Sequence, residues 1–211
     1  MKRIWLNQLE MSNMEVMLKN VRIAFWNGFK AKKFGSGDGE PRFSTAMFIE
    51  PGSDNDKAVE EAILTVAKEK WEKKAAAILS TIRGSRKTCF YFKGTLTNDE
   101  GEPYEGAEGF YTVNAGQPES KGAPLVIDAR RDASGQFPVL TAKDGKPYSG
   151  CYCNIKIDVW AQDNDFGKAI RASLVTVQFS KNGDAFGGNM KKTSDGFEEV
   201  EEEGSDADDL S

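Results

Sequence analysis

The chain has 211 residues, enough for one domain with a core of its own, and its 28 basic and 33 acidic side chains give a net charge of −5. It contains no histidine, which excludes catalytic triads and zinc sites that depend on one. Three cysteines without a regular framework, a first segment unlike a signal peptide and no apolar run of about 20 residues indicate a reduced protein inside the cell, away from membranes.

The charge is divided between two regions. Residues 1–192 carry 28 basic and 24 acidic side chains, a net charge of +4, whereas residues 193–211 carry nine acidic side chains and no basic one. Because this last segment offers little apolar surface to offset the entropy of ordering, we expect a disordered acidic tail. Such a tail either serves solubility alone, or competes with a nucleic acid for the basic body and recruits partner proteins.

The domain is expected at residues 16–192, after an N-terminal extension at 1–15. Its first strand is predicted from Val16, where apolar and polar residues begin to alternate. The alternation places Phe25 on the buried side of the strand and Trp26 on the exposed side.

The loop that follows, residues 27–41, is rich in glycine but lacks the GK[ST] ending of a phosphate-binding loop. It places lysines between two phenylalanines, with Lys30, Lys32 and Lys33 between Phe29 and Phe34. Lysines that meet phosphates beside rings that stack on bases are typical of single-strand binding. The alternative is a flexible hairpin loop with incidental lysines.

A strand at 42–50 is followed by a change of period. From residue 54 to residue 83 apolar side chains recur at steps of three to five, and Gly84 supplies a C-terminal stop. The pattern predicts one long amphipathic helix. Trp71 lies on its apolar stripe and is therefore expected in the core.

Residues 84–94 return to a period of two, which places Lys87, Tyr91 and Lys93 on an exposed side with Arg86 beside them. Five more strands are expected at 109–114, 124–128, 137–141, 148–162 and 168–181. One helix among many strands predicts a mainly β fold, built as a small barrel or sandwich.

Cys151 and Cys153 are separated by one residue, as half of a metal site could be. A structural zinc site needs four ligands, and the chain offers three cysteines and no histidine. Both thiols continue the apolar face of a strand that includes Ile155 and Ile157. We therefore expect core packing, with no metal and no cofactor.

The opposite face of the same strand carries aromatic and basic side chains. Exposed rings are unfavourable in water unless something covers them, and bases offer flat faces. The alternative is that the helix or a partner in a homodimer covers this face. The strand patterns together nominate these DNA-binding residues: Trp26, Lys30, Lys32, Lys33, Arg86, Lys87, Tyr91, Lys93, Tyr152, Lys156 and Trp160.

The segment "YSGCYCNIKIDVWAQDNDFGKAIRASLVTVQFSKNGDAFGG" (148–188) resembles phage single-stranded DNA-binding proteins of a family long catalogued as a domain of unknown function. "KNVRIAF" and "KAVEEAI" are also similar to that family, so the resemblance covers residues 16–188. It implies an expanded OB-fold barrel that coats single-stranded DNA without sequence preference or catalysis, during phage replication or recombination in the cytoplasm of the infected bacterium. The tail departs from such proteins because it ends in "DADDLS", without a terminal aromatic residue.

Two other functions stay open on the residues alone. A metal-dependent nuclease would use carboxylates, for which the candidates are Asp128, Asp132, Asp158, Asp163 and Asp165. A phage protein-interaction factor would instead use the exposed aromatic side chains as a protein interface.

Overall fold

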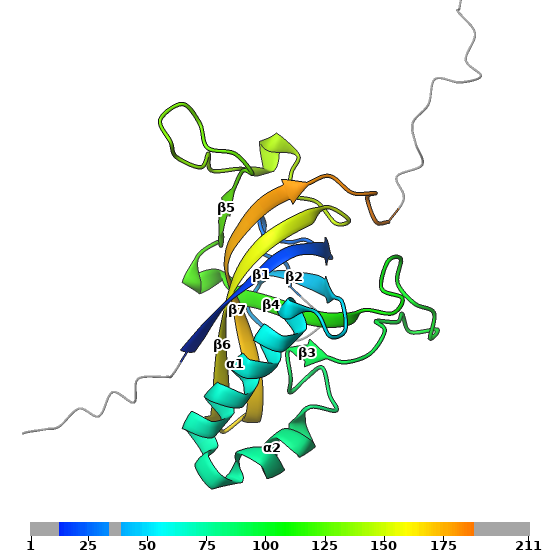
Figure 1. Cartoon of the computed structure of the whole chain (residues 1–211), viewed down its shortest axis with the longest axis vertical. Helices are drawn as coiled ribbons and strands as arrows, with labels where there is room; N and C mark the ends of the chain where they lie inside the picture. Colours follow the sequence, from blue (N-terminus) through cyan, green and yellow to red (C-terminus); the bar gives the residue numbers. More distant parts are fainter. Residues whose placement is uncertain (1–12, 34–38, 188–211) are drawn as a thin grey trace, which may run out of the picture.

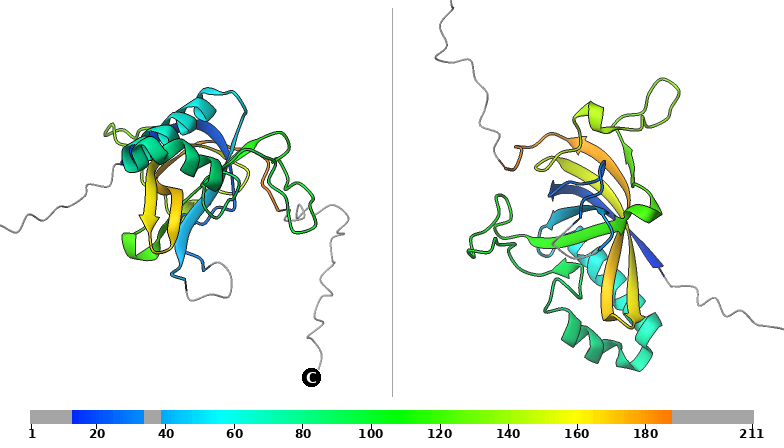
Figure 2. Two further views of the ribbon diagram at one scale, coloured as in Figure 1. Left: turned by 90° about the horizontal axis from the view of Figure 1, so that it is seen from below. Right: turned by 180° about the vertical axis from the view of Figure 1, so that it is seen from behind.

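Residues 13–33 and 39–187 are described by a computed structural model of the chain, and within them seven strands form one sheet in the order β3-β4-β2-β1-β6-β7-β5 (Figures 1 and 2). The strands are β1 (Asn13–Ala24), β2 (Arg42–Ile49), β3 (Tyr91–Phe92), β4 (Tyr111–Pro118), β5 (Leu125–Ile127), β6 (Tyr152–Asn164) and β7 (Gly167–Lys181). The acidic tail expected at 193–211 lies outside the described residues.

The sheet curls until its ends meet on β7. The segment before β3 runs parallel to β7, where the Phe90 amide donates to the Ile170 carbonyl at 3.1 Å and the Ile170 amide to the Thr88 carbonyl at 2.9 Å. The other end of β7 pairs in parallel with β5. The expected mainly β class with one long helix is confirmed, and the closed sheet is the expanded OB-like barrel that the resemblance implies.

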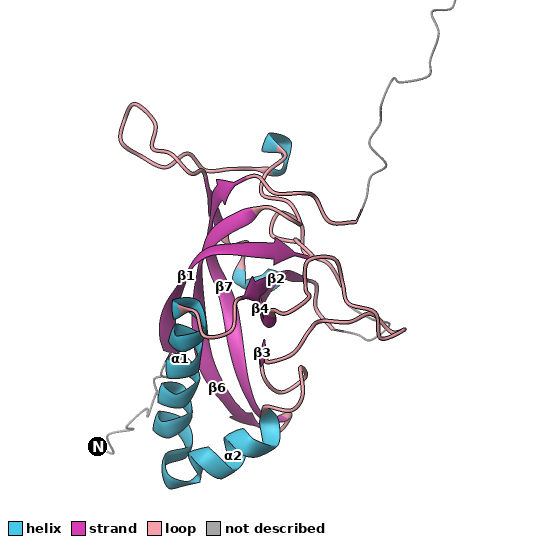
Figure 3. Ribbon diagram, turned by 45° about the vertical axis from the view of Figure 1, so that its right-hand side comes forward, coloured by secondary structure: helices cyan, strands magenta, loops and turns pink. Residues whose placement is uncertain are grey.

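The core fills the inside of this barrel. Cys151, Cys153 and Ile155 are fully buried, so the prediction that both thiols pack in the core is confirmed. The α-helix α1 (Asp54–Trp71) lies beside β1 and β6, and its buried stripe closes the core from that side (Figure 3). Trp71 belongs to this stripe, as predicted.

The helix predicted over 54–83 is divided in two. It ends at Trp71 because Glu72 takes a left-handed backbone with φ of 46°, and a 3-10 turn (Glu72–Lys74) leads into α2 (Ala75–Ile82). The Trp71 indole anchors the break by donating from Nε1 to Asp163 at 2.9 Å. The change of direction brings α2 against β7, which a straight helix would not reach. Of the helices in the described residues, none has the length and apolar character needed to cross a membrane.

The sides assigned to Phe25 and Trp26 are wrong. β1 ends at Ala24, and Phe25 adopts a left-handed backbone with φ of 52°, so the alternation of the strand stops there. Phe25 points outward, whereas the Trp26 ring packs against the core and meets Phe29 edge-on at 5.5 Å between centroids. Gly28 leaves room for that ring, because a β-carbon there would overlap it.

Several strand boundaries also differ from the prediction, and the strand expected at 109–114 is β4 at Tyr111–Pro118. β1 begins at Asn13 and not at the predicted Val16, because residues 13–15 pair with residues 158–160 of β6. Residues 84–94 form a strand only at Tyr91–Phe92, and 137–141 contributes one bridge, between Val139 and Ile127.

A smaller apolar cluster holds the loop between β3 and β4 on the outside of the barrel. Leu96 and Ala107 from this loop pack with Phe48 on the outer face of β2, and Phe186 packs against the cluster. The loop is therefore fixed beside the outer face of β2 and β4.

Candidate nucleic-acid interface

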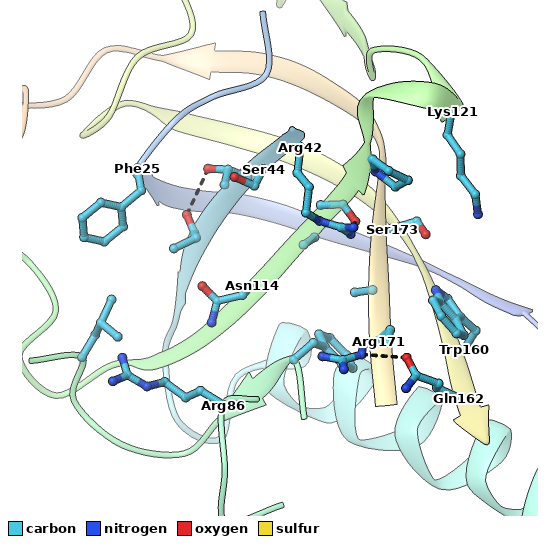
Figure 4. A pocket seen from close by; sticks show the side chains of 18 of the residues that line it. Phe25, Arg42, Ser44, Arg86, Asn114, Lys121, Trp160, Gln162, Arg171 and Ser173 are labelled. Atoms are coloured by element: carbon cyan, nitrogen blue, oxygen red, sulfur yellow. Dashed lines mark hydrogen bonds between the residues drawn. The ribbon is translucent and has the colours of Figure 1, made fainter. Parts of the chain in front are cut away.

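A groove of about 860 Å³ runs over the outside of the barrel. β2 and β4 line one part of it and β6 and β7 another, while the loops before β3 and between β3 and β4 complete it (Figure 4). Strands that are distant in the sequence thus contribute side chains to one surface, since the barrel closes near this point.

The charge of the groove is mostly positive. Its lining includes four cationic side chains, Arg42, Arg86, Lys121 and Arg171, and one acidic side chain, Asp99. In the described part of the chain no carboxylate forms a salt bridge with any of the four. They are therefore available to an anionic ligand.

Two of these guanidinium groups lie close enough to influence each other. Burial, and then the positive charge of Arg42, lower the pKa of Arg171 from its usual value. Arg171 is held in place by a hydrogen bond of 2.8 Å from Nη1 to the Lys87 carbonyl, and Arg42 by one of 3.0 Å from Nη2 to the Gly116 carbonyl. Neutral carbonyls hold both groups without cancelling their positive charge. A phosphate beside them would therefore relieve their mutual repulsion.

Aromatic side chains stand at two ends of the groove. Trp160, half-buried on β6, lies at one end, and Phe25 lies at the other (Figure 4). Tyr104 meets Phe25 edge-on, with 4.9 Å between ring centroids. Neutral polar side chains lie between them, among them Ser44, Asn114 and Ser173. The groove thus combines cations, rings and hydrogen-bonding groups, as single-strand binding surfaces do.

Of the eleven nominated residues, Arg86 and Trp160 line the groove. Lys32 and Lys87 lie at its border, because the Lys32 backbone pairs with Arg42 and the Lys87 carbonyl accepts from Arg171. Lys30 and Lys33 are exposed in the same loop as Lys32.

The exposed position expected for Tyr91 is wrong. Its side chain is only 3% exposed, and its hydroxyl donates to Asp56 of α1 at 2.8 Å. Burial and this carboxylate raise the pKa of Tyr91. Lys93 is exposed but pairs with Glu60 of α1 at 2.9 Å. β3 faces α1 at this point, so its polar side meets the helix instead of a ligand.

Trp26, Tyr152 and Lys156 do not line the groove. Trp26 covers the core, and Lys156 forms a salt bridge of 2.8 Å with Glu15. Tyr152 lies at the far end of β6, where the Lys181 ammonium stands 4.5 Å from its ring centroid. The eleven nominated residues therefore do not share one surface, because β6 is long and its outer side chains meet different neighbours along its length.

Sequence reasoning missed Arg42, Lys121, Arg171, Phe25 and Tyr104. Arg42 and Arg171 lie on the polar side of alternating strands, the signal that nominated Trp160, and could have been found by it. Phe25 was assigned to the core, and Tyr104 lies in a loop without any period. Only the closed barrel brings all five together.

Of the five aspartates considered for a nuclease, Asp128, Asp132 and Asp163 have partners in separate parts of the structure. Lys146 pairs with Asp128 at 3.0 Å and lowers its pKa, and Asp132 accepts hydrogen bonds within its own turn. Asp163 accepts from Trp71 and from Lys168. Among the described residues no three histidine, cysteine or acidic side chains form a group that could hold a metal ion.

Comparison with known proteins identifies a family and a similar phage protein. Residues 14–210 match the family model described as "Enterobacter phage Enc34, ssDNA-binding protein". The putative protein p50 of Acyrthosiphon pisum secondary endosymbiont phage 1 is 34% identical over 191 residues, 89% of this chain and 94% of that protein.

Two solved structures share the fold. The single-stranded DNA-binding protein from bacteriophage Enc34 in complex with ssDNA has a TM-score of 0.62 at 21% identity, over 82% of this chain and 89% of that one. Another structure of the Enc34 protein has a TM-score of 0.59 at 22% identity, over 86% of this chain and 88% of that one. The matched family is one of DNA-binding proteins and not of enzymes, in agreement with the non-catalytic expectation. The chain thus belongs to the Enc34 phage family of single-stranded DNA-binding proteins.

Proposed function

We propose that this chain binds single-stranded DNA in the groove. The observation that carries the proposal is the pairing of four cationic side chains, free of carboxylate partners in the described residues, with aromatic rings at both ends of one groove. Cations neutralise phosphates, and each ring that stacks on a base contributes about 1–3 kcal/mol.

The aromatic rings favour single strands over a duplex. Bases in a duplex already stack on each other, so their faces are covered, whereas an unpaired strand can turn its bases toward a protein ring. Phosphates and base faces are common to every sequence. Binding therefore depends little on which bases are present.

We further propose a role in phage DNA replication or recombination, in the cytoplasm of the infected bacterium. Residues 193–211, outside the described part, carry nine acidic side chains and no basic one, which is the charge of a competitor for the groove. The same segment is proposed to recruit replication or recombination proteins. Family membership and charge support these roles.

Tryptophan fluorescence tests the binding proposal. Trp26 and Trp71 pack against the core, and Trp5 lies outside the described residues, so Trp160 is the indole of the groove. A thymine oligomer should quench the full chain less at higher salt, and Trp160→Phe should remove most of the quenching. Quenching that survives in Trp160→Phe would place the DNA outside the groove. Absence of quenching in both proteins would reject DNA binding.

A chain that ends at Lys192 tests the tail. Tighter binding of the same oligomer, with the largest gain at low salt, is the expected result because the competitor has been removed. Equal or weaker binding would reject competition by the tail.

A further inference from the structure

Phe25 lies at the end of the groove away from Trp160 (Figure 4), and Tyr104 forms an exposed aromatic pair with it. Their rings are 4.9 Å apart at an interplanar angle of 85°, and the residues are 45% and 38% exposed. An edge-to-face contact leaves much of one ring face uncovered. A flat ligand can stack on that face.

The backbone on both sides of Phe25 holds its ring outward. The residue keeps a left-handed conformation, which is unfavourable for a large side chain. The Asn27 side chain donates to the Phe25 carbonyl at 2.9 Å, and the Trp26 amide donates to the Ser149 hydroxyl at 3.0 Å. Because the Trp26 ring packs against the core, the turn directs the neighbouring Phe25 ring away from the core.

Tyr104 is also held by an anchored backbone. Its amide donates to the Leu96 carbonyl and its carbonyl accepts from the Ala107 amide, each at 2.9 Å. Leu96 and Ala107 are both buried in the cluster outside β2. The two rings are therefore arranged before any ligand arrives, which lowers the entropy cost of stacking.

The charge around this pair determines which part of a nucleotide would lie there. Residues 94–120 contain no lysine or arginine, and residues 99–108 carry five acidic side chains, Asp99, Glu100, Glu102, Glu105 and Glu108. Arg22 approaches this loop at Gly106, where it donates to the Gly150 and Asp184 carbonyls. The carboxylates outnumber it, so a phosphate would be attracted instead to Arg42 and Arg171. The group that approaches Phe25 and Tyr104 is therefore the uncharged one, the nucleobase.

We propose that Phe25 and Tyr104 form a second base-stacking subsite, which takes one nucleobase of the strand whose other bases reach Trp160. This inference rests on the proposed function and adds a defined path to it. Phosphates follow the basic side of the groove, and bases turn toward the acidic and aromatic loop.

The test compares a thymine oligomer with an abasic oligomer of the same length, each of about 12 nucleotides, within the range of site sizes of OB folds. Both carry the same phosphates, but only one carries bases. Phe25→Leu and Tyr104→Leu should each weaken binding of the thymine oligomer by about fivefold or more and leave the abasic oligomer unchanged. The salt dependence should stay the same, because no phosphate contact is lost.

Phe166→Leu is the matched control. Phe166 is 93% exposed at the turn between β6 and β7 and does not line the groove, so its loss should not affect either oligomer. Thermal unfolding of each variant shows whether the fold is kept. Tyr104→Leu, in a separate loop, provides the test if Phe25→Leu disturbs its turn.

The outcomes separate the two proposals. Binding of thymine oligomers by the native chain, with both variants equal to Phe166→Leu, would overturn the subsite and leave the function in place. Equal weakening of thymine and abasic oligomers would also overturn it, since the effect would not involve a base. Failure of the native chain to bind any oligomer would reject the proposed function itself.

Discussion

Trp160 on β6 and Arg171 on β7 are cross-strand partners, and both side chains line the same groove. Directly opposed residues of antiparallel strands project to the same side of the sheet. A stacking ring and a cation are therefore presented side by side by two paired strands. Strands hold such geometry more rigidly than loops do.

Trp160→Ala should weaken binding of a thymine oligomer by about 1–3 kcal/mol, because one stacked base is lost. The free energy of unfolding should hardly change, since Trp160 lies on the outer face of the barrel and is half-buried. Titration by anisotropy of a labelled oligomer and denaturation in urea give the two values. Comparable losses of binding and of stability would show that Trp160 serves the core.

Arg42→Gln should reduce the salt dependence of binding. Removal of one phosphate contact lowers the slope of log affinity against log salt by about 0.7 for a single strand. The exposed Lys73, in the turn between α1 and α2, is a suitable control because it does not line the groove. If Lys73→Gln lowered the slope as much as Arg42→Gln, the groove would not be the path of the phosphates.

Asp99→Asn should tighten binding, because it removes the acidic side chain that lines the groove. An exposed charge changes affinity by about 0.2–1 kcal/mol, and added salt should reduce the gain. Glu61→Gln, on the exposed side of α1, changes the net charge equally and should have little effect. An equal gain from both variants would point to net charge instead of position.

Asp56→Asn should destabilise the fold near neutral pH by about 1–3 kcal/mol. Burial by itself raises the pKa of Asp56, but hydrogen bonds from the Gly52 amide and the Tyr91 hydroxyl, together with Lys93, outweigh burial and lower it. A carboxyl with a lowered pKa stabilises the fold above its unfolded pKa of about 3.9 and loses this effect as the pH falls through the folded value.

The measurement for Asp56 is urea denaturation of native and variant chains across the acid range. The difference in unfolding free energy should be constant above about pH 5 and shrink below about pH 4. The exposed Asp54 is the control, and Asp54→Asn should show only a small difference. If the difference in unfolding free energy between the native and Asp56→Asn chains did not change with pH, the charge of Asp56 would not be what stabilises its hydrogen bond with Tyr91.

Glu72→Gly should raise the free energy of unfolding by about 1 kcal/mol, because glycine tolerates the left-handed backbone at the break between α1 and α2. Glu61→Gly, within α1, should lower it by about the same amount. Loss of stability in both variants would show that Glu72 does not carry strain.

Local patterns in the sequence predicted much of the fold. Alternation identified β1, β2, β6 and β7 and the buried thiols of Cys151 and Cys153, because period two reports directly which side of a strand is apolar. The same pattern failed at Phe25, where one left-handed residue exchanges inside for outside. It also failed at Glu72, where nothing in the local sequence marks the end of α1.

The candidate site was predicted only in part, for a related reason. Alternation distinguishes the inner face of a strand from the outer face, but it does not say what covers the outer face. Tyr91 and Trp160 both lie on polar sides of predicted strands, yet Tyr91 meets Asp56 beneath α1 while Trp160 opens into the groove.

Local sequence accounts for the mainly β class, most of the buried faces, the division of charge and the resemblance to phage single-strand binders, since each depends on neighbouring residues or on composition. Which polar side chains meet depends on the tertiary structure. Arg42, Arg86, Lys121 and Arg171 come from four separate parts of the chain and share a groove only because the sheet closes on β7. Closure depends on long-range pairing, which local patterns do not encode.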